Sequence, residues 1–105
     1  MRKLLIAIPF ILISGAAFAA VKCDLEQVKG IQVKSNGDLL YTSTEGKRRK
    51  IGAASNQAAA SHSLQVIGLA LEKRLYVQAA FPDGYDCASP NPEVLAEWIY
   101  VQNAQ

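Results

Sequence analysis

The chain has 105 residues, half of them apolar, and a formal net charge of +2 at pH 7. This length predicts one small domain with a thin core. Two of its 11 basic residues, Arg2 and Lys3, lie in a segment that we expect to be removed, which lowers the basic count to that of the 9 acidic residues. Such a balance argues against nucleic acid or an anionic membrane surface as the partner.

Residues 1–19 have the pattern of an export signal. Arg2 and Lys3 precede an apolar run at 4–13, and Ala17-Phe18-Ala19 provides a small-x-small cleavage site. The apolar run is too short to favour a membrane-spanning helix. We therefore predict a signal peptide at 1–19, a single mature domain at 20–105 with no membrane span, and a secreted or periplasmic location.

Cys23 and Cys87 are the two cysteines of the chain, so one intrachain pairing is available. Export delivers the chain to an oxidising compartment, where a disulfide can compensate for a small core. Closing so long a loop contributes roughly 4 kcal/mol in the chain-entropy description. We predict a Cys23–Cys87 disulfide.

The first half of the mature chain predicts three antiparallel strands. Residues 25–34 read as a strand whose alternation shifts phase at Gly30, which indicates a β-bulge. Hairpin-turn chemistry follows at 35–38, and residues 39–44 form the returning strand. A second turn at Glu45-Gly46 leads into a strand at 47–51.

A helix follows, beginning near Ala58 and ending at about residue 71 or 72. Ser55 or Asn56 can cap its first turn. Its apolar residues occupy two sides, with Ala60, Leu64, Ile67 and Leu71 on one and Val66, Leu69 and Ala70 on the other. We expect the first side to cover the sheet. The second either meets another subunit, which makes Val66, Leu69 and Ala70 candidate interface residues, or is buried within the domain.

Two further strands are predicted after the helix. Residues 75–81 alternate as in a half-buried strand, and residues 95–102 form the last strand, with Trp98 and Tyr100 on one face. Pro82-Asp83-Gly84 and a loop at 88–92 connect them. The fold class is mainly β with one helix, in the order β-β-β-α-β-β.

The residues that carry chemistry do not form a catalytic constellation. His62 is the single histidine, on the predicted helix, and the two cysteines are too few for structural zinc. We therefore expect neither an enzyme, a metal site nor a cofactor. The run Lys47-Arg48-Arg49-Lys50 makes Lys47, Arg48 and Arg49 candidates for binding an anionic group, or else forms a solvated basic edge strand.

Aromatic residues are the other candidates for ligand binding. Tyr85, in a loop beside Asp86, and Trp98 on the last strand can stack on a sugar ring. For Trp98 a core position is the favoured alternative, because it lies within a strand. Tyr85, Asp86 and Trp98 are therefore candidate glycan contacts.

The element order and cysteine positions resemble an OB-fold, a five-stranded barrel with a helix after its third strand. The stretch 23–51 (CDLEQVKGIQVKSNGDLLYTSTEGKRRKI) is similar to the opening of cholera-type toxin B subunits. The stretch 63–77 with the later Cys87 resembles subtilase-cytotoxin and Shiga-type B subunits. This resemblance implies a homo-oligomer, such as a pentameric ring, that recognises a glycan or glycoprotein and carries a toxin A subunit. The alternative is a periplasmic interaction or envelope-associated protein without a toxin partner.

Overall fold

The structure is a computed structural model that describes residues 20–89 and 91–103. The predicted signal peptide at 1–19 lies outside these residues. The elements, in chain order, are β1 (Val21–Lys22), β2 (Glu26–Val33), β3 (Leu39–Ser43), β4 (Arg48–Gly52), the 3₁₀ turn η2 (Ala54–Asn56), α2 (Gln57–Lys73), β5 (Tyr76–Phe81) and β6 (Trp98–Gln102). None of the described helices is long and apolar enough to cross a membrane.

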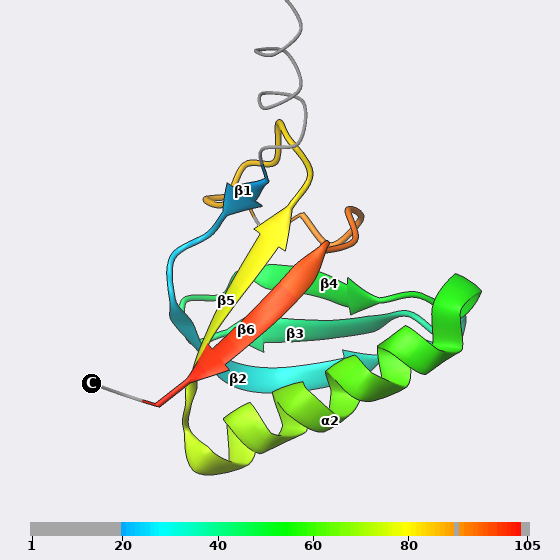
Figure 1. Cartoon of the computed structure of the whole chain (residues 1–105), viewed down its shortest axis with the longest axis horizontal. Coiled ribbons are helices and arrows are strands. Elements are labelled where there is room, and N and C mark those ends of the chain that lie inside the picture. Colours follow the sequence, from blue (N-terminus) through cyan, green and yellow to red (C-terminus); the bar gives the residue numbers. More distant parts are fainter. Residues whose placement is uncertain (1–19, 90, 104–105) are drawn as a thin grey trace, which may run out of the picture.

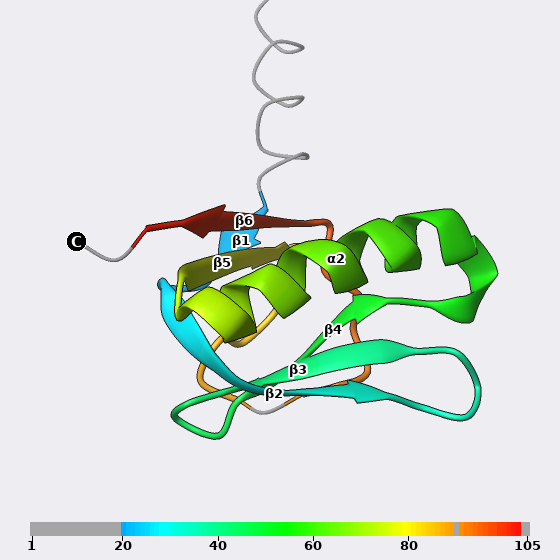
Figure 2. The ribbon, with the colours of Figure 1, turned by 90° about the horizontal axis from the view of Figure 1, so that it is seen from below.

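The strands form one antiparallel sheet in the order β1-β5-β2-β3-β4, with β6 paired to β5. The sheet folds over on itself: in Figure 2, β1, β5 and β6 lie above β2, β3 and β4, and in Figure 1, β5 and β6 cross these strands diagonally. The helix α2 runs along one side of both layers (Figure 2). The helix contacts β2 and β4 most extensively and also reaches β6. The predicted class, mainly antiparallel β with one helix, is confirmed. The short strand β1 was not predicted, because two residues carry no readable alternation.

The predicted barrel, however, is not closed. Across the described residues β4 and the segment before β6 meet at one parallel bridge, Lys50–Leu95, where the Ala96 amide donates to the Lys50 carbonyl at 2.9 Å. Immediately afterwards the Glu97 amide donates to the Ala80 carbonyl at 2.7 Å, so the chain turns toward β5. The last strand therefore begins at Trp98 rather than at residue 95. A cavity of about 230 Å³ remains between β4, α2 and β6.

The turns and the bulge follow the predictions. The pairing of β2 with β3 shifts register between Val28 and Gly30, which is the expected bulge. Gly37 has φ +97° in the β2–β3 hairpin, and a β-carbon there would lie 2.7 Å from the Ala54 β-carbon. Glycine is therefore required at this position both by its backbone conformation and by the close approach of Ala54.

The helix begins as predicted but buries a different arc. The Asn56 Oδ1 accepts a hydrogen bond from the Ala59 amide at 3.1 Å, which confirms Asn56 as the cap. Because the helix lies in the angle between the two layers, Ile67 and Ala70 face inward and are fully buried. The assignment of Ala70 to a subunit interface is therefore wrong.

The exposed apolar side chains of α2 flank that buried arc on both sides. Leu64 and Leu71, expected to cover the sheet, are 42% and 38% exposed. Val66 and Leu69 are 40% and 44% exposed, so these two interface candidates remain accessible.

The predicted disulfide is confirmed. Cys23 and Cys87 are bonded, with their α-carbons 5.4 Å apart across a sequence separation of 64. The bond joins the segment after β1 to the loop between β5 and β6. It also closes a second small core around Cys23, Ala79 and Phe81, beside the main core that contains Tyr41, Ile67 and Val77.

Candidate binding site beside the disulfide

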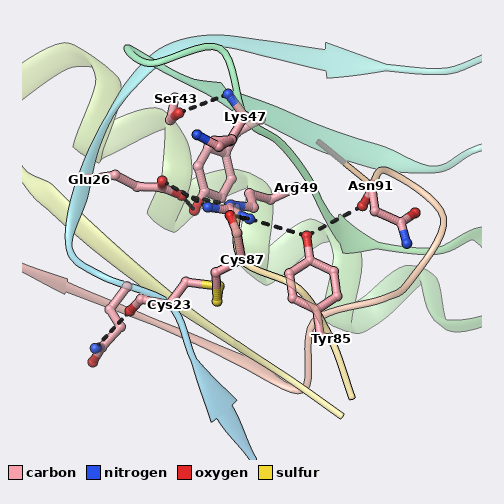
Figure 3. A network of polar contacts seen from close by, with 10 residues as sticks. Cys23, Glu26, Ser43, Lys47, Arg49, Tyr85, Cys87 and Asn91 are labelled. Atoms are coloured by element: carbon pink, nitrogen blue, oxygen red, sulfur yellow. Dashed lines mark hydrogen bonds and ion pairs between the residues drawn. A yellow bond between two sulfur atoms is a disulfide. The ribbon is translucent and has the colours of Figure 1, made fainter. Parts of the chain in front are cut away.

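Arg49 is the centre of a buried polar network. Its side chain points inward from β4 and is 3% exposed, while its neighbours Arg48 and Lys50 are only partly buried. The Arg49 Nε donates to Glu26 Oε2 at 2.9 Å and its Nη2 donates to Oε1 at 3.1 Å (Figure 3). This two-point geometry compensates the charge of both side chains where water is largely excluded.

The network extends from this ion pair to the loop that carries Cys87. The Arg49 Nη1 donates to the Tyr85 hydroxyl at 3.2 Å and to the Cys87 carbonyl at 3.1 Å. From the other side, the Tyr41 hydroxyl donates to Glu26 Oε2 at 2.6 Å. One guanidinium thereby connects β2, β4 and the loop between β5 and β6.

Burial and neighbouring groups keep Arg49 charged and Tyr41 neutral. Burial by itself lowers the pKa of Arg49, but the hydrogen bonds to Glu26 and Tyr85 and the Glu26 charge outweigh it and leave the pKa above its ordinary value. Burial and the nearby Glu26 charge raise the pKa of Tyr41 above its ordinary value. Tyr41 therefore remains a phenol that can donate to the carboxylate.

A polar cavity of about 410 Å³ opens over this network. The buried pair Glu26–Arg49 lines it together with Cys87. Asp24 and Glu45 are exposed at the cavity, and Lys47 is partly buried there, with its amide bonded to the Ser43 Oγ at 3.1 Å. The exposed Leu25 adds an apolar wall. The cavity therefore offers donors and acceptors close together.

Two of the three basic candidates lie together, and the third does not. Lys47 and Arg49 line the same cavity, but Arg48 points away and donates to Gln32 Oε1 at 2.6 Å. The interpretation of the whole run as a solvated edge is wrong for Arg49, because strand alternation turns it to the same side as the buried Ile51.

The aromatic candidates are separated. Tyr85 is not a free loop aromatic: its ring stacks on Phe81 with centroids 3.8 Å apart, and its hydroxyl contacts Arg49 and the Asn91 carbonyl. Trp98 is not in the core but 41% exposed, because the inward positions of β6 are taken by Ile99 and Val101. It lines the cavity between β4, α2 and β6 instead.

Asp86 and His62 are both exposed. The Asp86 Oδ1 accepts a hydrogen bond from the Ala88 amide at 3.0 Å, so this carboxylate shapes its own loop. His62 lies on the surface of α2. Within residues 20–89 and 91–103, no three His, Cys, Asp or Glu side chains gather in a way that could hold a metal ion.

Glu26 and Tyr41 are the members of the network that the sequence analysis missed. They lie 23 and 8 residues before Arg49, and no local motif connects them to it. A signal for the inward direction of Arg49 does exist, since Arg49 shares its phase with Ile51 on a short strand. Its partner can be found only from the strand pairing.

Comparisons with known proteins do not assign a family. A scan against protein-family models finds no match, and a search of the curated proteins finds no significant match. Neither comparison links the chain to toxin B subunits, so that resemblance is supported only by the stretches 23–51 and 63–77.

Proposed function

We propose that this chain is an exported, disulfide-closed recognition module that binds a glycan or glycoprotein in the cavity beside the disulfide. The observation that carries the proposal is the Glu26–Arg49 pair beneath a rim of Asp24, Glu45 and Lys47. A sugar presents neighbouring hydroxyls that donate and accept, and this rim supplies carboxylate acceptors and an ammonium donor within one cavity.

Rigidity supports binding at this position. The Glu26 and Arg49 side chains are fixed by each other and by Tyr41, Tyr85 and the Cys87 carbonyl. A ligand that settles on such a floor does not have to order it, so less binding free energy is lost on association. A volume of about 410 Å³ also falls within the range of small-molecule sites. The proposed role is recognition rather than catalysis.

Self-association is part of the proposal. Val66 and Leu69 leave apolar surface on α2, and Trp98 and Tyr100 are 41% and 50% exposed on β6. Exposed apolar surface of this kind favours contact with another protein. We propose a homo-oligomer, with a ring and a catalytic partner chain as the form that the toxin resemblance implies. Native mass spectrometry of the mature chain tests it, and a strict monomer at micromolar concentration would contradict it.

A second candidate function rests on the same aromatic residues. Trp98 and Tyr100 share one face of β6 and fit a protein partner, as in a periplasmic interaction or envelope-associated protein. In that case a pull-down recovers a protein whose binding is lost on Trp98→Ala, and no sugar binds.

A glycan array of the oxidised mature chain tests the main proposal. We expect binding that is weakened about tenfold by Lys47→Met or Glu45→Gln, the effect of losing one charged hydrogen bond. Lys34→Met and Glu72→Gln are matched controls, since both residues are exposed and outside the cavity lining. An array without binding, or equal losses in the controls, would contradict the proposal.

A further inference from the structure

Each cysteine of the disulfide is held in place by contacts other than the sulfur–sulfur bond. The Cys23 amide donates to the Ala79 carbonyl at 3.0 Å, and the Gln78 Nε2 donates to the Cys23 carbonyl at 3.0 Å. Both bonds anchor Cys23 on β5. On the opposite side, the Cys87 carbonyl accepts from the Arg49 Nη1 at 3.1 Å.

The anchoring of Cys87 depends on a guanidinium that is itself fixed. Glu26 holds Arg49 by two hydrogen bonds, so the position of the Cys87 carbonyl is set by β2 and β4. Tyr85 adds a second anchor two residues earlier, through its stacking on Phe81 and its contact with Arg49. The segment from Tyr85 to Cys87 is therefore attached to the sheet by side chains that do not involve sulfur.

We propose that Arg49 is a positioning residue for the disulfide: in the folded, reduced chain it holds Cys87 beside Cys23, and the bond closes in a preformed site. The sheet contacts at Cys23 and the Arg49 contact at Cys87 bring the two thiols together by folding. The bond therefore does not depend on a random encounter of the thiols in the unfolded chain. This role goes beyond ligand recognition and does not depend on it.

The different exposure of the two cysteines sets the order of the chemistry. Cys23 is 1% exposed, whereas Cys87 is partly exposed, so a small disulfide such as oxidised glutathione reaches Cys87 first. The Cys87 thiolate attacks it, forms a mixed disulfide and displaces one glutathione thiolate. The Cys23 thiolate then attacks the Cys87 sulfur and displaces the second. Two electrons pass from the protein to glutathione, and the two thiol protons go to the released thiolates.

Folding without the bond is the first test. The proposal predicts that the mature Cys23→Ser/Cys87→Ser double variant keeps the far-ultraviolet circular dichroism and the amide dispersion of the oxidised chain. A variant that is unfolded in buffer at 25 °C would overturn the proposal, because the site would then not exist before the bond.

The thiol–disulfide equilibrium tests the role of Arg49. The effective concentration of the two thiols, measured in glutathione buffers under native conditions, should fall at least about tenfold in Arg49→Met, the size expected for losing a hydrogen bond to a charged group. Arg48→Met is the matched control on the same strand and should match the wild type. Tyr85→Phe keeps the ring and removes the hydroxyl, so it should lower the value by a smaller factor even if Arg49→Met does not fold. Unchanged values in Arg49→Met or Tyr85→Phe, or an equal fall in Arg48→Met, would overturn the assignment.

Single-cysteine variants test the order. Cys87 in Cys23→Ser should react with iodoacetamide at least about tenfold faster than Cys23 in Cys87→Ser, because thiol reactivity follows access to the thiolate. Equal rates would contradict the order of attack.

Discussion

Arg49 and Glu26, which are 23 residues apart, meet in a two-point ion pair of 2.9 and 3.1 Å that is almost closed to solvent. This contact connects two strands of the sheet, and through the Cys87 carbonyl it reaches the disulfide. It is also part of the lining of the polar cavity. Stability, closure of the loop and the proposed recognition therefore depend on the same pair.

Removal of one partner of the pair should destabilise the fold strongly. Arg49→Met leaves the Glu26 carboxylate buried without its counter-charge, which costs roughly 3–5 kcal/mol of unfolding free energy. Urea unfolding of the oxidised chain measures it. Arg48→Met should change the unfolding free energy by less than about 0.5 kcal/mol, as is usual for surface positions.

A double variant separates the net contribution of the ion pair to the unfolding free energy from the cost of leaving one buried charge unpaired. Glu26→Gln/Arg49→Met should lose clearly less stability than the sum of the two single variants, because neither charge is then left uncompensated. Strict additivity of the two losses would contradict a direct ion pair.

Reduction of the disulfide should lower stability without abolishing the fold. Opening a loop of sequence separation 64 costs about 4 kcal/mol in the chain-entropy description. Urea midpoints with and without reductant measure the difference, and the serine double variant provides the control for effects of the reductant itself. Equal midpoints would show that the bond does not constrain the unfolded chain.

Stability should fall at alkaline pH in a way that depends on Tyr41. Burial and the Glu26 charge raise the pKa of Tyr41 above its ordinary value of 10.0, so above that pH the unfolded chain releases a proton that the folded chain retains. The Tyr41 contribution is fully present below pH 10 and is lost as the pH rises, by at most about 1.4 kcal/mol per pH unit. Tyr41→Phe should be less stable at neutral pH but lose less on going from about pH 8 to pH 11. Parallel losses in both proteins would contradict the prediction.

Two glycine substitutions separate backbone strain from close packing. Gly37 and Gly46 have φ of +97° and +89°, but a β-carbon would meet Ala54 only at Gly37. Gly46→Ala should cost about 1 kcal/mol from its backbone conformation, and Gly37→Ala should cost more. Thermal unfolding of the two variants compares them. Equal losses would show that the hairpin moves away from Ala54 at little cost.

Local features could be predicted from the sequence, because their causes lie within a few residues. The bulge at Gly30, the turn at Gly37 and the cap at Asn56 each depend on neighbouring residue types. The disulfide could also be predicted, since two cysteines allow one pairing. These features positioned the helix and most of the sheet correctly.

The misplaced features depend on which strand edges pair. Trp98 is exposed and the barrel is open because the segment before β6 meets β4 only at the Lys50–Leu95 bridge and then turns to β5. No local pattern at 88–97 indicates this turn. The Arg49–Glu26 pair depends on the order β4-β3-β2 and on both side chains pointing inward. Lys47 and Arg49 could be selected as candidates from the basic run in the sequence. The Glu26 carboxylate that Arg49 binds could not, because it lies on another strand.

The location of bound sugar tests the central claim most directly. The best ligand from the glycan array is titrated into ¹⁵N-labelled mature chain, and amide chemical shifts are followed. We expect the largest changes at Asp24, Leu25, Glu45 and Lys47, around the cavity over the Arg49–Glu26 pair. Changes confined to Trp98–Gln102, or the absence of any change at saturating sugar, would contradict a binding site beside the disulfide.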